Sequence, residues 1–544
     1  MSKETILYNG IRQSADWPPH DVDPMSDEAV TPPYLLDAAE GGCRPEVIDI
    51  TVGRQLFVDD FLIRETDLHR VCHRAVPYAG NPVLRAEAPE ETDPNGNVGT
   101  SAGGVWYDET EKKFRMWYDV RFNPLLGYAE STDGIHWQRI PVDESGSNIV
   151  MGADVKNGTC SVFPDPDAVP EERYKMFLHS MNRHQSTLDY PYYLPRDSHD
   201  ENNYASALYV SADGLHWRQK GALSRGLCGD MTTVYYDALR KKWVNSIRTY
   251  ARTRYGETVF NGRVRYYDEH DRFEDLLNWS PNAPFWLKCD RLDPIDPEAG
   301  VPPQMYNFDA IAYESLLVGM FQIWRGPENY VIERTGKPKI TELIAAYSRD
   351  GFHFSRPDRR AIIPASRTEG AWDRGYIHCA NGGLIVRRDR IDIYYSGFSG
   401  VTRDGRQSAH AGESIGFASL RRDGFVSMEG AGCLVTRPMT VHKASEHLFV
   451  NAECPKDALR VELLDAAGRV IPEYSMEDCI PTGGDSTMTE IRWRHGRGTD
   501  FLRDRVFSVR FSLRDAGKLW SFWFSGDEHG ESGGILGAGY VAAP

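Results

Sequence analysis

A repeated pattern of about ten residues is the feature of this sequence that most restricts the fold. Residues 128–137 read YAESTDGIHW, residues 208–217 read LYVSADGLHW, and residues 346–354 read AYSRDGFHF. Weaker copies lie at 266–279 and 417–428. Five copies distributed over residues 128–428 are typical of a β-propeller with four-stranded blades and some long loops. We therefore predict an all-β chain whose main part is a five-bladed β-propeller.

The repeated segment has a structural explanation that involves no chemistry. Its Asp-Gly pair is typical of a tight hairpin turn with positive φ angles, and the alternating residues before it form a strand. The aromatic residue that follows is expected to fill the gap between neighbouring blades. We therefore assign Asp133, Asp213 and Asp350 to the architecture.

The two ends of the chain lack the repeat. Residues 1–45 carry many prolines and no periodic pattern, which predicts an irregular arm packed on the propeller. VGRQLFVDDFLI (52–63) is predicted as the first strand of a propeller spanning 46–430. Beyond residue 430, alternating strands such as LRVELLDAAGRVI (459–471) predict a C-terminal antiparallel β-sandwich at 431–544.

Composition excludes several classes of function. The net charge of −17 over 544 residues argues against a nucleic-acid partner, because nucleic-acid sites are basic. No run of 18 apolar residues predicts a membrane span, and the N-terminal residues do not resemble a secretory signal, so we expect a cytoplasmic protein. The nine cysteines are scattered, as expected of reduced thiols and not of a disulfide framework or a zinc site.

Several segments resemble the five-bladed propeller glycoside hydrolases of families 32, 43 and 68, and most closely a bacterial family-32-like group. They are GRQLFVDDFLI, GNPVL (80–84), KKFRMWY (112–118), STDGIHW (131–137), KKWVNSIR (241–248), AYESLLVGMFQI (312–323) and SRDGFHF (348–354). The resemblance implies a substrate at the axial mouth of the propeller, where carboxylates act as acid, base or nucleophile. It implies no cofactor, and an axial metal ion stays open by analogy with family 43.

Five carboxylates are candidates for this catalytic role. Asp230 stands seven residues before the turn at Asp237, where an inner strand should start, and the resemblance implies an acid in this blade. Asp309 lies near the start of the next blade. The remaining three candidates, in loops before inner strands, are Glu91, Asp93 and Asp373. The alternatives are a turn or cap at Asp230, an Asp-Pro/Asn-Gly turn at Asp93, and a surface ion pair between Asp373 and its neighbour.

Five further residues are predicted to bind the substrate. Trp372, beside a carboxylate, suits stacking against a sugar ring. The others are Arg248, Tyr306, Arg374 and His378. A structural ion pair is the alternative for Arg248, and a packing role is the alternative for His378.

These observations predict a glycosidase that acts on small glycans, including furanosidic ones, with Asp230 and Asp309 as the first carboxylate pair. Two alternatives stay open: a carbohydrate-binding propeller without catalysis, and a lyase or isomerase that relies on Tyr306, His378 or Arg248. The expected partner is a carbohydrate, and homo-oligomerisation stays open.

Overall fold

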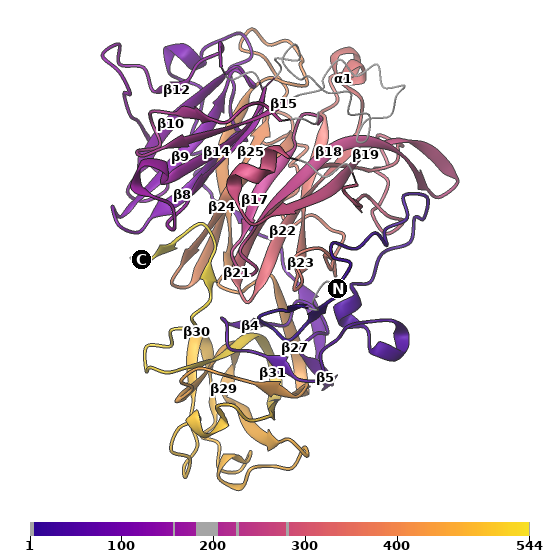
Figure 1. The fold of residues 1–544 in the computed structure, drawn as a ribbon, viewed down its shortest axis with the longest axis vertical. Coiled ribbons are helices and arrows are strands. Elements are labelled where there is room, and N and C mark those ends of the chain that lie inside the picture. The colour runs from indigo at the N-terminus through magenta and orange to yellow at the C-terminus, as the bar shows by residue number, and fades with distance from the viewer. Residues whose placement is uncertain (1–4, 156–157, 181–204, 225–227, 279–281, 543–544) are drawn as a thin grey trace.

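Antiparallel β-strands make up most of the computed structural model of this chain (Figure 1). The structure describes residues 5–155, 158–180, 205–224, 228–278 and 282–542. Trp279, the marker of one weaker repeat copy, lies outside these residues. Five antiparallel strand groups occupy the upper part of Figure 1, and a further sheet lies below them.

Each strand group follows the order of the chain. The first group holds β8 (Val98–Asp108), β9 (Lys113–Val120), β10 (Leu125–Ser131), β11 (Gln138–Arg139) and β12 (Ile149–Met151), and the second holds β13 (Cys160–Pro164), β14 (Tyr174–Ser180), β15 (Ala205–Ser211) and β16 (Arg218–Lys220). The third group holds β17 (Thr233–Asp237), β18 (Lys242–Tyr255), β19 (Thr258–His270) and β20 (Phe285–Leu287), and the fourth holds β21 (Gln304–Glu314), β22 (Leu316–Gly326) and β23 (Ile340–Ser348). The fifth group holds β24 (Gly375–Arg387), β25 (Arg390–Phe398) and β26 (Glu413–Arg421). The short β7 (Val76–Pro77) pairs with β26 and so completes the fifth group from the N-terminal side.

Apolar clusters fill the spaces between successive groups. Separate clusters join the first group to the second, the second to the third, the third to the fourth and the fourth to the fifth. A further cluster joins the fifth group back to the first, through contacts of residues such as Val105 and Met116 with Ile385 and Tyr394. The first strands also meet directly, since β8 forms parallel bridges to both β13 and β24. The groups therefore pack in a closed order, fifth against first.

The repeated segment forms the same turn three times, but not the predicted one. At the first copy, the Asp133 carboxylate accepts hydrogen bonds from the amides of Ile135 and His136, both at 2.8 Å, and contacts the His136 ring. Only the glycine takes a positive φ, 80° at Gly134, whereas the predicted hairpin turn needs positive φ at both central residues. The aspartate side chain thus stabilises a wider loop. Its role is architectural, as predicted.

The turns also connect neighbouring groups. The carbonyl of Gly134 accepts a hydrogen bond from the Tyr394 hydroxyl of the fifth group at 2.6 Å. The carbonyl of Gly214 accepts one from the indole of Trp117 in the first group at 2.7 Å. The repeat therefore contributes to packing between groups as well as to its own loop.

The lower sheet combines both ends of the chain. Its nine strands are β3 (Ile48–Asp49), β4 (Gln55–Leu56), β5 (Ile63–Thr66), β6 (His69–Cys72), β27 (Val426–Thr436), β28 (Met439–Thr440), β29 (His447–Asp465), β30 (Thr482–Ile491) and β31 (Phe507–Ser525). The segment 52–63, predicted as the first strand of the propeller, instead pairs here, with β4 on β31 and β5 on β27. Its alternation of apolar residues specifies a strand but not the sheet that the strand joins.

The end of the chain returns to the upper groups. β32 (Ile535–Leu536) pairs with β21, and β33 (Tyr540–Val541) pairs with β24. Among the described residues, the α-helix α1 (Asn329–Thr335) is short, and no helix has the length and apolar character needed to cross a bilayer. The nine cysteines are free thiols, six of them buried.

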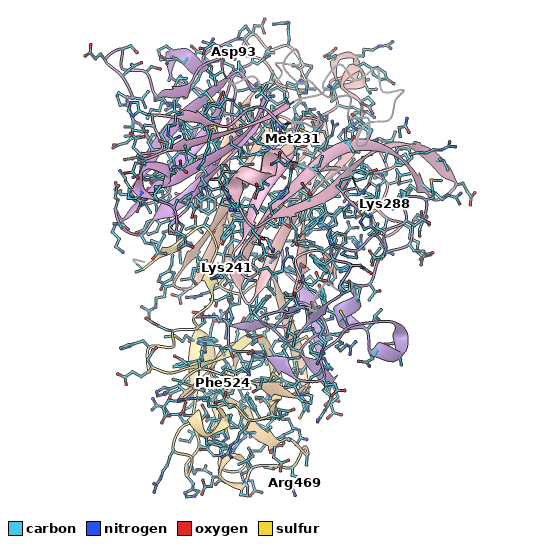
Figure 2. All side chains as sticks on the ribbon, in the orientation of Figure 1. Asp93, Met231, Lys241, Lys288, Arg469 and Phe524 are labelled. Atoms are coloured by element: carbon cyan, nitrogen blue, oxygen red, sulfur yellow. The ribbon has the colours of Figure 1, made fainter. Side chains whose placement is uncertain are left out.

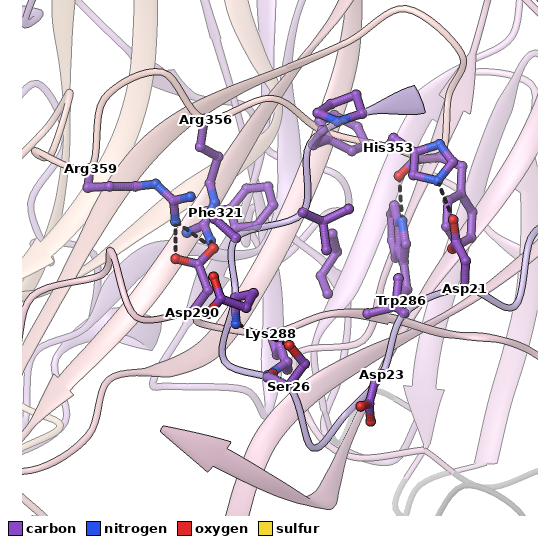
Figure 3. Close-up of a pocket in the computed structure, with 18 residues that line it drawn as sticks. Asp21, Asp23, Ser26, Trp286, Lys288, Asp290, Phe321, His353, Arg356 and Arg359 are labelled. Carbon is purple, nitrogen blue, oxygen red and sulfur yellow. Dashed lines mark hydrogen bonds and ion pairs between the residues drawn. The ribbon is translucent and has the colours of Figure 1, made fainter. Parts of the chain in front are cut away.

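The N-terminal arm packs across the third and fourth groups. A cavity of about 200 Å³ lies between arm residues such as Asp21 and Ser26 and the strands beneath them (Figure 3). On its floor, Arg356 and Arg359 form ion pairs with Asp290 at 2.6 and 2.9 Å. Arm residues within 5–45 make polar contacts with the third strand group: the Trp17 indole donates to Glu269 at 3.0 Å, and the Pro24 carbonyl accepts a hydrogen bond from Thr253 at 2.9 Å.

One such contact should make stability depend on pH. The buried His353 ring lies between Asp350, at 2.7 Å, and Asp21 of the arm, at 3.3 Å. Although burial opposes the charged ring, these carboxylates raise the pKa of His353 to about 9. A raised folded-state pKa gives stability that is complete below about pH 6.5, the ordinary pKa of histidine, and is lost as the pH rises through 9.

We expect this contribution to the free energy of unfolding to be on the order of 2–3 kcal/mol. It is measured as the difference between wild type and His353→Gln in chemical denaturation at pH 6 and at pH 9.5. The difference should be large at pH 6 and small at pH 9.5. An equal difference at both pH values would contradict the assignment.

Candidate active site

Asp230 and Arg248 form the centre of the candidate site. Asp230 precedes β17, and its side chain is 40% exposed. The guanidinium of Arg248, on β18, lies 2.7 Å from its carboxylate and is itself only 4% exposed. Arg248 also donates a hydrogen bond to the hydroxyl of Tyr250 at 2.9 Å. A buried, anchored arginine therefore holds an ionised carboxylate that faces solvent.

Aromatic side chains surround this ion pair. The hydroxyls of Tyr306, from β21, and Tyr376, from β24, lie 2.7 Å apart. Their rings belong to one buried cluster with Met231, the neighbour of Asp230, and Trp324. Such rings suit contact with the apolar faces of a sugar. We name Asp230, Arg248, Arg263, Tyr306, Lys339 and Tyr376 the Asp230 cluster.

A buried arginine sets the relative position of two parts of the cluster. Arg265, with no exposed surface, donates hydrogen bonds to the carbonyls of Met231 and Tyr306, both at 2.8 Å. It thereby joins the third strand group to the fourth beside Asp230. The upper end of the strand groups, away from the lower sheet, holds Met231, whereas Lys241 of the same group lies near that sheet (Figure 2).

The backbone around the cluster adopts an uncommon conformation. Met231, Tyr376 and Phe122 have φ values of 59°, 49° and 58°, in the left-handed region that side chains disfavour. All three belong to the same aromatic cluster. Each such residue costs on the order of 1–3 kcal/mol, and such costs concentrate at functional sites. Positive φ also occurs elsewhere in the described residues, for example at Lys241, Asp423 and Asp504, so the strain here is consistent with a site but does not identify one.

Charge at the cluster is predominantly positive. Burial opposes ionisation of Asp230, but the positive charges of Arg248, Arg263 and Lys339 together lower its pKa below the ordinary value. Burial also lowers the pKa of two neighbouring histidines, His179 to about 4 and His410 to about 3, so both are neutral at pH 7. Asp230 is therefore ionised at neutral pH.

Four of the predicted residues lie together in this region. Arg248 and Tyr306 belong to the Asp230 cluster. His378 is fully buried, and its ring lies 4.4 Å from that of Tyr376, with Gln322 as its hydrogen-bond partner at 3.3 Å. This burial is consistent with the packing role that was the predicted alternative.

Asp309 lies deeper than the cluster. It follows Tyr306 by three residues on β21, across a bulge, which at about 3.3 Å per residue places it roughly 7–10 Å further along the strand. The carboxyl is buried and accepts a hydrogen bond from the Asn381 amide at 3.1 Å. Burial raises the pKa of Asp309 to about 7. The structure thus does not bring Asp309 to the level of Asp230.

Glu91 and Asp93 have structural partners instead of an open position. The Glu91 carboxylate has no exposed surface and accepts hydrogen bonds from the Tyr118 hydroxyl and from Arg139, each at 2.7 Å, as well as from two backbone amides. Asp93 accepts the amide of Gly96 at 2.7 Å, as in the predicted turn. Glu91 thus has a structural role in its loop, and the hydrogen bond of Asp93 is the one expected of the predicted turn.

Trp372, Asp373 and Arg374 directly precede β24 of the fifth group, and Arg374 lines a small hollow together with Lys339 and Tyr376 of the Asp230 cluster. The Trp372 ring packs on Tyr395 at 5.2 Å, and the Tyr395 hydroxyl donates to Asp373 at 3.2 Å. Arg374 donates to the carbonyl of Gly336 at 3.0 Å. These contacts fasten the loop to β25 and to the end of α1.

The sequence analysis missed several polar residues near the cluster. Arg263 lies on β19 and Lys339 directly precedes β23, in both cases before the point at which the repeat copies at 266–279 and 346–354 begin, so no repeat marks either residue. Glu413, the first residue of β26, is buried and accepts a hydrogen bond from Ser396 at 2.7 Å, and its charge helps to raise the pKa of Tyr376. A position at the start of a strand, the criterion that selected Asp230, applies equally to Glu413. Within the described ranges, no group of three or more His, Cys, Asp and Glu side chains is arranged to hold a metal ion.

Solved structures similar to this chain act on or bind glycans. One is an N-acetylgalactosamine deacetylase from F. plautii in complex with blood group B trisaccharide, 14% identical, with a TM-score of 0.42 over 65% of this chain and 96% of that chain. Another is a thermostable family-43 glycoside hydrolase, 12% identical, with a TM-score of 0.37 over 61% and 92%. A third is a fructofuranosidase from Schwanniomyces occidentalis, 10% identical, with a TM-score of 0.35 over 81% and 96%.

The predicted resemblance to propeller-type glycoside hydrolases is thereby confirmed. At such low identity the likeness concerns the fold and transfers no activity. No family model matches the chain, and no curated protein matches it.

Proposed function

We propose that the five strand groups are the blades of a five-bladed β-propeller and that the lower sheet is a β-sandwich. The closed order of apolar clusters, with the fifth group packed on the first, supports this proposal. Strand pairing suggests a division other than cuts at 45 and 430: residues 48–72 go with 426–525, and residues 535–541 go with the propeller.

We propose that the protein is a carbohydrate-active enzyme, a glycoside hydrolase that acts on small glycans, furanosidic ones included. The observation that carries the proposal is the solvent-facing Asp230 carboxylate, held by buried Arg248 and bordered by Tyr250, Tyr306 and Tyr376. A glycosidase needs an ionised carboxylate at the sugar and a group that protonates the leaving oxygen. Asp230, with its lowered pKa, suits the first role.

We assign the role of proton donor to Asp309, the partner of Asp230 in the predicted carboxylate pair, whereas the family resemblance implied the acid in the blade of Asp230. A carboxyl with a pKa of about 7 is partly protonated at neutral pH, as a general acid should be. Its depth requires that the leaving group of the substrate extend below Tyr306 to reach it. This assignment makes Asp309→Asn a direct test of the two-carboxylate mechanism.

A lyase acting through Tyr306 is the second candidate. The Tyr306 and Tyr376 hydroxyls are hydrogen-bonded, and the Lys339 ammonium lies 3.6 Å from the Tyr376 ring centroid. Burial raises the pKa of Tyr306 to about 12, although Arg263 and Arg248 lower it, so in this candidate the protonated Tyr306 hydroxyl acts as the proton donor to the leaving group.

Product analysis separates the two candidates. Purified protein is incubated with a panel of aryl glycosides and oligosaccharides, and the products are weighed by mass spectrometry. A hydrolase yields products that have gained one water, whereas a lyase yields products without it. Specific binding of glycans with no turnover would leave only the carbohydrate-binding alternative.

A further inference from the structure

Among the described residues, two cations of the Asp230 cluster form no ion pair with an acidic side chain, although the charges of Asp230 and Glu328 partly offset that of Lys339. Lys339 is only 6% exposed, yet its ammonium makes no hydrogen bond or ion pair with any residue that the structure describes. It lies over the rings of Tyr376 and Tyr306, 3.6 and 5.2 Å from their centroids. Arg263, on β19, donates to the side-chain oxygen of Gln304 at 2.7 Å and otherwise contacts aromatic rings, that of Trp324 at 5.0 Å.

Burial of unpaired cations is costly unless something offsets their charge. Removing an ammonium group from water without a partner costs several kcal/mol, so such a residue is rare in an ordinary interior. Burial and the nearby Arg263 lower the pKa of Lys339 to about 7, which is the signature of this cost. A group held at such a cost near a solvent-facing carboxylate is a candidate for ligand binding.

Asp230 does not neutralise the two cations. Its carboxylate already forms the ion pair with Arg248, at 2.7 Å. Arg248, Arg263 and Lys339 together carry more positive charge than this one carboxylate offsets, in a chain whose net charge is −17. The local excess of positive charge therefore runs against the charge of the whole protein, and it is concentrated beside the aromatic rings.

We propose that Arg263 and Lys339 bind an oxyanion, a carboxylate, sulfate or phosphate group, beside Asp230. The planar guanidinium and the ammonium supply donors that match such a group, and the neighbouring rings supply a surface for a sugar. The proposal rests on the proposed function in one respect, since it names acidic glycans as the substrate class. The same donors would accept free inorganic phosphate as a co-substrate.

Calorimetric titration of the full chain tests the site. The probes are glucuronate, inorganic phosphate and, as a neutral comparison, glucose, applied to wild type, Lys339→Met and Arg263→Gln. We expect one or both anions to bind wild type and to bind each variant at least about tenfold more weakly, with glucose unaffected. Binding of glucuronate but not phosphate indicates that the oxyanion is part of the glycan. Binding of phosphate but not glucuronate indicates that the oxyanion is a free ion.

Two controls accompany this titration. Lys242→Met removes one positive charge, as Lys339→Met does, but from the ion pair of Lys242 with the exposed Asp271 in the third strand group, which also carries Arg263. This variant should leave anion binding unchanged. Anion affinity of wild type should fall between pH 6 and pH 8, as Lys339 loses its proton, and Lys339→Met should lack this fall. Thermal unfolding of every variant verifies that it is folded.

No binding of either anion to wild type at about 10 mM, or equal binding by wild type and both variants, would overturn the proposal. Failure of the oxyanion site can be distinguished from failure of the proposed enzymatic function. Turnover of neutral glycans by fully active Lys339→Met would refute the oxyanion site alone. Anion binding with the expected losses, but no conversion of any glycan, would refute the enzyme alone.

Discussion

Replacement of Asp230 by asparagine should lower the turnover of a glycan substrate by about 10²–10⁴-fold. Asparagine keeps the shape of the side chain and its hydrogen bond to Arg248 but removes the negative charge that attacks the sugar or activates water. Because the side chain is 40% exposed, the variant should stay folded. Steady-state kinetics on the substrate found in the panel, together with thermal unfolding, checks both expectations.

Asp271→Asn is the matched control. It removes a carboxylate that is 80% exposed and paired with Lys242, on the same strand group. Its activity should equal that of wild type. Full activity in Asp230→Asn would remove the glycosidase assignment, and so would a loss of activity that is explained by unfolding.

Asp309→Asn distinguishes the mechanisms further. A hydrolase that uses Asp309 as its acid loses turnover in this variant, mostly toward substrates with poor leaving groups. A lyase that uses Tyr306 keeps its turnover in the Asp309→Asn variant. The Asn381 amide and the amide of Ala310 both donate to the carboxyl, and asparagine keeps an acceptor oxygen for only one of them. A loss of stability of about 1–3 kcal/mol is therefore expected, and thermal unfolding of the variant accompanies the kinetics.

The largest effect on stability is expected for Arg54→Met. Arg54 is buried between the two parts of the molecule, where it forms an ion pair with Asp423 at 2.9 Å and lies 3.6 Å from Glu314. Its guanidinium also stacks on Trp523 of the lower sheet, 3.8 Å from the ring centroid. Both carboxylates have no exposed surface, so loss of Arg54 leaves them short of positive charge.

We expect Arg54→Met to lower the free energy of unfolding by about 3–5 kcal/mol. Arg469→Met, at an arginine that is 79% exposed and paired with Asp465, should change it by less than about 1 kcal/mol. Chemical denaturation measures both. The double variant Arg54→Met/Asp423→Asn should recover part of the loss, because it removes one uncompensated charge. A small effect of Arg54→Met would mean that Arg422 alone suffices for both carboxylates.

We also expect the ion pairs of Arg54, Asp423 and Glu314 to lose their contribution to stability at acidic pH. Burial opposes ionisation of Asp423, but Arg54 and Arg422 lower its pKa to about 2. A lowered folded-state pKa gives stability that is complete above about pH 4, the ordinary pKa of aspartate, and is lost as the pH falls toward 2. This loss should be absent in the double variant.

Sequence periodicity predicted the strands and the architectural role of the repeats, because both depend on neighbouring residues. The alternation of apolar residues specifies a strand locally, and the Ser-x-Asp-Gly segment holds its loop through contacts within six residues. The turn type was wrong because only Gly134 takes a positive φ and the Asp133 side chain holds a wider loop through its own hydrogen bonds. Position before an inner strand selected Asp230, and Arg248 and Tyr306, predicted to bind the substrate, lie beside it.

The tertiary structure alone decided which of these groups faces solvent and which is enclosed. Asp230 and Asp309 have similar positions before or within inner strands, yet their pKa values shift in opposite directions, since cations surround one and apolar burial dominates at the other. Arg263 and Lys339 meet over Tyr306 although they are 76 residues apart in the sequence. Arg54 contacts Asp423 across 369 residues. Burial and charge are sums over such distant neighbours, and no local pattern in a chain encodes them.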